Sequence, residues 1–125
     1  MRIRYQIVSN PKQTIYWLNF PESSVFSPTV TLVIDDFFYV DISASIAQGI
    51  TDEKRCLVLE TINEINDKFQ FINLCMDENH DIYSCQQFIL AGDERIMCMQ
   101  IMTNLLVFYD LHRRTAEKIH SIMCM

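Results

Sequence analysis

Two histidines near the end of the chain are the first side chains whose type suits metal binding or general-base chemistry. His112 and His120 lie eight residues apart, about 80° around a helix that turns about 100° per residue. Neither has a cysteine or a carboxylate at the spacing of a metal site. We therefore predict no metal site, with His112 at an interface or a helix flank and His120 in solvent.

An acidic segment at residues 77–81, with the sequence DENHD, gathers carboxylates of the kind that bind calcium. It lacks the glycine and the distal glutamate of an EF-hand loop. The favoured interpretation is a solvated hairpin tip. The alternative is a small-molecule- or metal-responsive regulator or enzyme that uses His80 with three acidic neighbours, namely Asp77, Glu78 and Asp81.

The sequence has no loop of the kind that nucleophilic or phosphate chemistry needs. Its two glycines, Gly49 and Gly92, stand far apart, whereas nucleotide-binding loops place two or three glycines within about six residues. No GxSxG motif is present. Asp35 and Asp36 are adjacent, and adjacent strand residues point to opposite faces, so a turn explains them better than paired catalytic carboxylates do. We predict a protein that is not an enzyme, with no catalytic residue and no cofactor.

Length and composition indicate one globular domain over residues 1–125. The chain is 50% hydrophobic and 21% charged, and its length suffices for one core. The net charge of −6 repels a phosphate backbone, so nucleic acid is not an expected partner. The five cysteines include no CxxC pair, which indicates reduced thiols. Polar residues at 9–13 interrupt the first apolar stretch, so we predict no signal peptide, no membrane span and a cytoplasmic location.

Alternating and β-branched stretches predict the strands. Residues 2–8 alternate as a half-buried strand does, whereas 14–20 are too short to decide between a strand and a helical turn. Residues 29–46 hold two apolar runs on either side of an Asp-Asp pair and predict two antiparallel strands. Residues 69–76 and 82–90 predict a hairpin around the acidic segment.

Two stretches have the spacing of amphipathic helices. In residues 52–68 apolar positions recur every three or four residues, and Thr51 is the predicted N-cap. Within this helix Asn63 and Asn66 share a face, where ties to neighbouring backbone are favoured over catalysis. Residues 94–123 predict a final helix of about 45 Å, which we expect to break or to find a partner. The expected class is α+β, an antiparallel sheet of about five strands packed by two or three helices.

Residues 54–71, KRCLVLETINEINDKFQF, and the INLCMDENHDIYSCQQFIL that follows resemble the YbjN family of bacterial sensory transduction regulators. The matching features are a helix with INEIN at 62–66, then KFQF at 68–71, a strand, the acidic turn and a second strand. The resemblance covers about residues 30–120. It implies a fold similar to that of type III secretion chaperones, which are small, acidic, usually dimeric α+β proteins that hold partner polypeptides without hydrolysing anything. Residues 1–20 depart from the implied order of helix, three strands, helix, two strands, helix, because they have the pattern of a strand. The resemblance implies no catalytic residue.

The leading hypothesis is a non-enzymatic protein-interaction module, a regulator or chaperone-like binder of a polypeptide partner. A second apolar stripe in the N-terminal half of the last helix is expected of a helix packed between a sheet and another subunit. Methionines cluster in this half, and adaptable Met-lined surfaces suit peptide binding, although a plastic core is the more common use. The expected partners are a second copy, in a homodimer, and an unidentified protein client. The predicted partner-binding or dimer residues are Met102, Leu105, Phe108, Tyr109 and His112.

Overall fold

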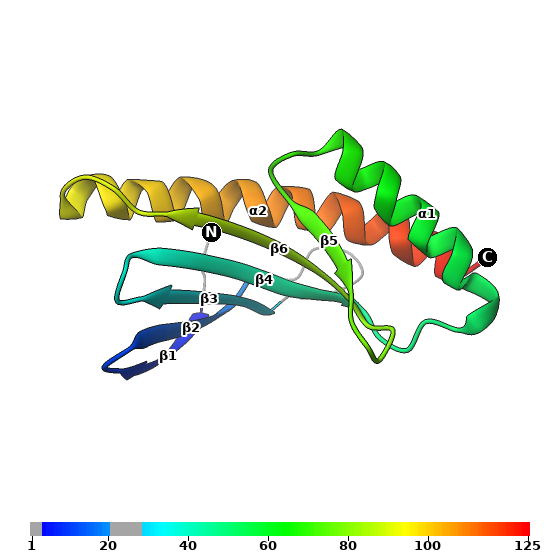
Figure 1. Ribbon diagram of the computed structural model, residues 1–125, viewed down its shortest axis with the longest axis horizontal. Coiled ribbons are helices and arrows are strands. Elements are labelled where there is room, and N and C mark those ends of the chain that lie inside the picture. The colour runs from blue at the N-terminus through cyan, green and yellow to red at the C-terminus, as the bar shows by residue number, and fades with distance from the viewer. Residues whose placement is uncertain (1–3, 21–28) are drawn as a thin grey trace.

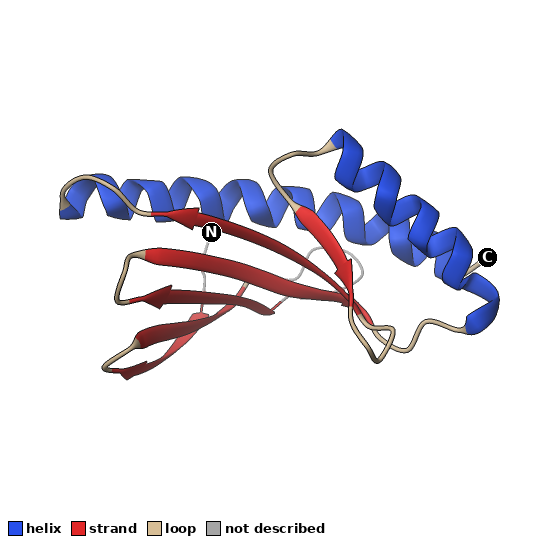
Figure 2. Cartoon of the chain, viewed as in Figure 1, coloured by secondary structure: helices blue, strands red, loops and turns tan. Residues whose placement is uncertain are grey.

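The computed structural model describes residues 4–20 and 29–125 of the chain. They form a six-stranded antiparallel sheet and two helices (Figure 1 and Figure 2), which confirms the α+β class. The sheet has the order β1-β2-β3-β4-β6-β5. The elements in chain order are β1 (Arg4–Asn10), β2 (Gln13–Asn19), β3 (Thr29–Asp35), β4 (Tyr39–Ala47), α1 (Asp52–Lys68), β5 (Asn73–Met76), β6 (Ile82–Ile89) and α2 (Glu94–Met123).

The sheet has one strand more than the sequence predicted. The stretch at 14–20, which left strand and helical turn open, is β2, and it pairs with β1 on one side and β3 on the other along all seven residues. Its β-branched and aromatic side chains suit a strand held between two others. The described part of the chain therefore begins with a hairpin, where the family resemblance implies an opening helix.

The first helix and the turn before β4 match their predictions. Two details differ: the side chain of the N-cap residue of α1 and the start of β5. In the β3–β4 turn the Asp35 carboxylate accepts hydrogen bonds from two backbone amides, each at 2.9 Å. Thr51 is the N-cap residue of α1, but its side chain makes no capping hydrogen bond. β5 begins at Asn73 and not at residue 69, because Phe69 still donates its amide to the Ile65 carbonyl at the end of α1.

The predicted last helix is confirmed as one unbroken helix, α2. Of the two expected outcomes, a break or a partner, the break does not occur. The first part of α2 crosses the sheet and its second part lies beside α1 (Figure 1). Asp93 caps the helix, since its side chain accepts a hydrogen bond from the Ile96 amide at 2.9 Å. The chain enters this cap through Gly92 at φ 100°, where an added Cβ would lie 2.9 Å from Ile96 Cγ2.

The core lies between one face of the sheet and the two helices. Below the N-terminal half of α2 it is built around Val30, Ile42 and Phe108. Between α1, β5 and the C-terminal half of α2 it is built around residues such as Val58 and Ile119. Among the described residues no second helix lies beside the N-terminal half of α2, so its cover there comes from the sheet alone.

The β5 edge of the sheet is closed by a side chain of α1. Asn66 donates from Nδ2 to the Leu74 carbonyl at 2.9 Å and accepts the Leu74 amide at Oδ1 at 2.7 Å. The amide group thereby imitates the backbone of a neighbouring strand. This confirms the predicted structural tie for Asn66, whereas Asn63 is exposed.

Candidate functional site: an apolar groove beside α2

A groove of about 270 Å³ with almost wholly apolar walls lies between the N-terminal half of α2 and the first three strands. Its position follows from the fold, because α2 crosses the sheet without reaching the outermost strand. We call it the apolar groove. It is lined by Tyr5 of β1, Tyr16 and Leu18 of β2, Leu32 and Ile34 of β3, and Cys98, Ile101, Met102 and Leu105 of α2.

Strand register explains why apolar side chains line the sheet side of the groove. Tyr16 is paired with Leu32, and Tyr5 with Leu18, so these side chains share the face that carries the core. Leu18 and Leu32 are buried, but Tyr5 is 63% exposed because no helix covers β1. The groove therefore lies at the edge of the core, where neither helix of the described chain covers the apolar side chains of the sheet.

The N-terminal half of α2 also carries exposed apolar side chains, of which Met102 lines the groove. Met99 and Met102 are 61% and 50% exposed, and Leu106 and Ile96 are close to these values. Met99, Met102 and Leu106 follow one another at steps of three and four residues, so they lie along one side of the helix. We call these three residues the methionine stripe. Exposed apolar surface next to an apolar groove is typical of an interaction site.

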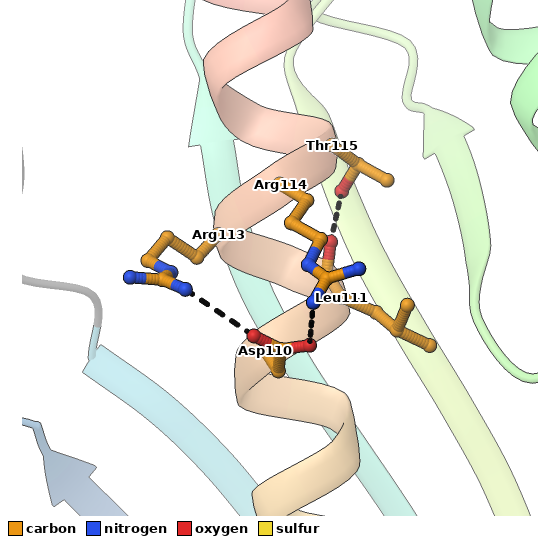
Figure 3. A network of polar contacts seen from close by, with 5 residues as sticks. All are labelled: Asp110, Leu111, Arg113, Arg114 and Thr115. Carbon is orange, nitrogen blue, oxygen red and sulfur yellow. Dashed lines mark hydrogen bonds and ion pairs between the residues drawn. The ribbon is translucent and has the colours of Figure 1, made fainter.

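The C-terminal half of α2 differs from this pattern, and Figure 3 shows its polar contacts. Asp110 forms ion pairs with Arg113 at 3.3 Å and with Arg114 at 3.1 Å. Thr115 donates its hydroxyl to the Leu111 carbonyl at 2.9 Å. Such exposed ion pairs add little stability, but they end the apolar surface one turn beyond the methionine stripe.

The structure separates the five residues predicted to bind a partner. Met102 is half exposed and lines the groove, and Leu105 forms the floor of the groove at 3% exposure. Phe108 and His112 are fully buried, while Tyr109 is partly buried and stacks on Phe20 with ring centroids 4.3 Å apart. Phe108 and His112 therefore face the protein's own sheet as core residues, whereas Met102 and Leu105 line the groove. Partner binding by the five residues stays a prediction.

The two histidines have structural contacts. His112 Nδ1 lies 2.5 Å from the Ser84 hydroxyl, and its ring stacks on Phe108. Burial, and secondarily the charge of His120, lowers the pKa of His112 to about 4. His120 is not in solvent as expected, because its Nε2 lies 2.5 Å from the Ile46 carbonyl and donates to it.

The acidic segment uses its carboxylates to build a turn. Asp77 accepts the amides of Asn79 and Asp81 at 2.9 and 3.0 Å, and Asp81 accepts the Gly49 amide at 2.7 Å. His80 occupies the left-handed position of this turn at φ 59°. In residues 4–20 and 29–125, no three His, Cys, Asp or Glu side chains come together as a metal site would require.

The face of the sheet away from the helices has a polar hollow of about 520 Å³, lined in part by Asp41, Ser43 and Tyr83. Next to it, the thiols of Cys75 and Cys85 lie 3.8 Å apart across β5 and β6. Burial, followed by the nearby Cys75, raises the pKa of Cys85 to about 12. This thiol is therefore a poor nucleophile at neutral pH.

Sequence reasoning missed the β1 and β2 side of the groove. The sequence did contain a signal for an apolar side of this strand, because Tyr5 and Ile7 fall on one side of the alternating stretch at 2–8. What the sequence could not show is that α2 stops short of covering that side. The methionines indicated the half of the helix that lines the groove, although a plastic core was the favoured interpretation.

Comparison of this chain with family models, with curated proteins and with solved structures finds no match. The resemblance to the YbjN family therefore stays a prediction. Neither helix of the described chain has the length and apolar character needed to cross a lipid bilayer.

Proposed function

We propose that this chain is a non-enzymatic protein-interaction module, a regulator or chaperone-like protein that covers its apolar groove with another polypeptide. The observation that carries the proposal is the groove itself, with apolar walls from β1, β2, β3 and α2 and exposed apolar side chains on the same half of α2. Burying a side chain of leucine or methionine size is worth about 1.5–3 kcal/mol. A few such side chains from a partner suffice for a stable complex.

Two features of the groove suit a polypeptide better than a small polar substrate. The methionine stripe can repack around different apolar side chains, since methionine is unbranched and flexible. The edge strand β1 lies at the open side of the groove and adds backbone hydrogen-bonding groups, which extended peptides use when they join a sheet. An apolar segment in extended form satisfies both.

The proposed setting is the cytoplasm, with protein and not nucleic acid as the partner. All five cysteines are free thiols in the structure, including the close pair Cys75 and Cys85, and free thiols suit a reducing compartment. The net charge of −6 disfavours binding to a phosphate backbone.

A displayed library of random peptides tests the proposal, with binding of selected peptides measured on the purified chain. We expect enrichment of apolar sequences whose affinity falls at least about tenfold in the Met102→Glu variant. Met125→Glu is the matched control, because Met125 is 82% exposed and does not line the groove. The proposal is wrong if no peptide is enriched and the chain is also a monomer in solution, or if peptide binding is the same in both variants and the parent protein.

The alternative function, a small-molecule- or metal-responsive regulator or enzyme near His80, stays a prediction of the sequence. It requires that a ligand bound to the folded state raise the melting temperature. A thermal-shift screen over divalent metals and nucleotides measures this directly, and a flat result counts against the alternative.

A further inference from the structure

The two edges of the sheet differ in a way that points to the partner. The β5 edge is occupied by the amide of Asn66, which pairs with Leu74 in both directions. At the other edge all seven residues of β1 are exposed, and in the described part of the chain β1 has β2 as its one neighbouring strand. One edge of this sheet is thus protected and the other is open.

β1 also lacks the devices that keep an open edge from pairing. Proteins protect such edges with proline, inward-pointing charges, bulges or very short strands. The sequence of β1 is RYQIVSN, without proline or glycine, and it pairs with β2 without a bulge. Its single charged residue is Arg4, at one end of the strand.

We propose that two copies of this chain pair antiparallel through β1, with Gln6 of each copy on the two-fold axis, to form one continuous sheet. This inference rests on the proposed function, since it names the polypeptide that covers the apolar groove. In this register Tyr5 lies opposite Ile7 of the second copy, and Ile7 opposite Tyr5 of the second copy. Both are aromatic–β-branched pairs, which stabilise neighbouring strands.

Charge is compatible with this register. Arg4 lies opposite the apolar Val8 of the second copy, so no like charges face each other. The two Arg4 side chains are about four residues apart along the strands, or about 14 Å at 3.4 Å per residue. This exceeds the Debye length of about 8 Å at physiological salt, so their repulsion is screened.

The same arrangement covers the groove. The two-fold axis of an antiparallel pair is perpendicular to the sheet, so both copies place their α2 on the same face. The second copy's β1 extends the sheet next to Tyr5, which lines the groove and is exposed in the single chain. A dimer interface of standard size buries about 800 Å² on each partner, more than one edge strand supplies. The methionine stripe, which is exposed beside the groove, provides the additional apolar surface.

Light scattering at tens of micromolar tests the pairing with two matched variants. Ile7→Lys places a charge on the proposed interface, where lysine is the residue that natural edge strands use against pairing. Ile89→Lys is the control, because Ile89 is also an exposed strand isoleucine, at 68%, but lies on β6. We expect a dimer for the parent protein and for Ile89→Lys, and a folded monomer with an unchanged circular dichroism spectrum for Ile7→Lys.

A cross-linking measurement tests the register even if Ile7→Lys fails to fold. Gln6→Cys is introduced after the exposed Cys56, Cys98 and Cys124 are replaced by serine, and mild oxidation is followed on a non-reducing gel. We expect a covalent dimer for Gln6→Cys and none for Arg4→Cys. A parent protein that is monomeric, a dimer that Ile7→Lys leaves intact, or a cross-link at Arg4 in place of Gln6 overturns the inference. Peptide binding at the groove in any of these cases would still support the proposed function with another partner.

Discussion

Ser84 on β6 and His112 on α2 join the sheet to its covering helix through a contact of 2.5 Å between Oγ and Nδ1. Both residues are fully buried. A neutral imidazole can accept the serine proton at Nδ1, whereas an imidazolium could not accept it and would be a buried charge. The lowered pKa of His112 shows that the folded protein keeps this ring neutral.

The first prediction concerns acid stability. The pKa of His112 is about 4 in the folded protein, against 6.5 for an ordinary histidine, so between these values the unfolded chain binds the extra proton. This contribution to stability is complete above pH 6.5 and is lost as the pH falls toward 4. We expect about 2 kcal/mol of the loss between pH 7 and pH 5 to come from this group. Urea unfolding of the parent and His112→Asn at both pH values measures it, and equal losses in the two proteins would refute the assignment.

The second prediction concerns the end of α2. Lys54 on α1 donates from Nζ to the carbonyls of Ile122, Met123 and Met125, at 3.2, 2.6 and 2.6 Å. The first two belong to the last turn of α2, where a helix end leaves carbonyls without intrahelical partners. Lys54→Met should lower the free energy of unfolding by about 1–3 kcal/mol. Lys118→Met, at an exposed position of α2, should change it by less than about 0.5 kcal/mol. Chemical denaturation compares the two, and equal effects would show that the contacts contribute nothing.

The third prediction concerns the protected sheet edge. Asn66→Ala removes both hydrogen bonds to Leu74 and should cost about 1–3 kcal/mol. Asn63→Ala, at an exposed position on the same helix, should be nearly neutral. Hydrogen exchange gives a local readout: the Leu74 amide should exchange faster in Asn66→Ala only. Unchanged protection of this amide would contradict the role assigned to Asn66.

The fourth prediction separates core from surface on α2. Leu105→Asp introduces a charge at a buried position and should unfold the protein, because an unpaired buried carboxylate costs several kcal/mol. Met102→Glu, three residues earlier and half exposed, should fold with a melting temperature near that of the parent. Thermal denaturation followed by circular dichroism distinguishes them. A stable Leu105→Asp protein would mean that this side chain is not in the core.

The fifth prediction concerns cysteine reactivity. Because burial raises the pKa of Cys85 to about 12, few Cys85 side chains are thiolates at pH 8, and the thiolate is the reactive form. Iodoacetamide should therefore modify the exposed Cys56 well before Cys85. Peptide mass spectrometry over a time course measures both rates. Modification of Cys85 at the rate of Cys56 would contradict the environment described for this thiol.

The sequence predicts those parts of the fold that depend on local patterns. The helix at 52–68 and the helix at 94–123 have their predicted bounds, because apolar spacing and polar flanks are local signals. The strand at 13–19 could not be settled, because a short β-branched and aromatic run suits a strand or a helical turn. It is a strand because it pairs with β1 and β3, and the run itself does not contain those strands.

In the candidate site, too, local patterns predict the helix and its apolar spacing, whereas tertiary contacts decide which side chains are exposed. Apolar spacing places Leu105 and Met102 on the last helix correctly, but it cannot tell which side of a two-sided helix faces the sheet. In the structure Phe108 and His112 lie in the core of this chain, while Met102 and Leu105 line the groove. The contribution of Tyr5 depends on how far α2 extends across the sheet, which is a tertiary property. The hydrogen bond of His120 with Ile46 of β4 likewise joins residues far apart in sequence.

The mass of the protein in solution shows whether a second copy covers the apolar groove. It is measured by light scattering on the parent chain and on Met102→Glu at tens of micromolar. We expect twice the mass of one chain for the parent protein, and a shift toward the mass of a single chain for the folded variant. A parent protein that has the mass of a single chain at every concentration would contradict the claim that a second copy covers the apolar groove.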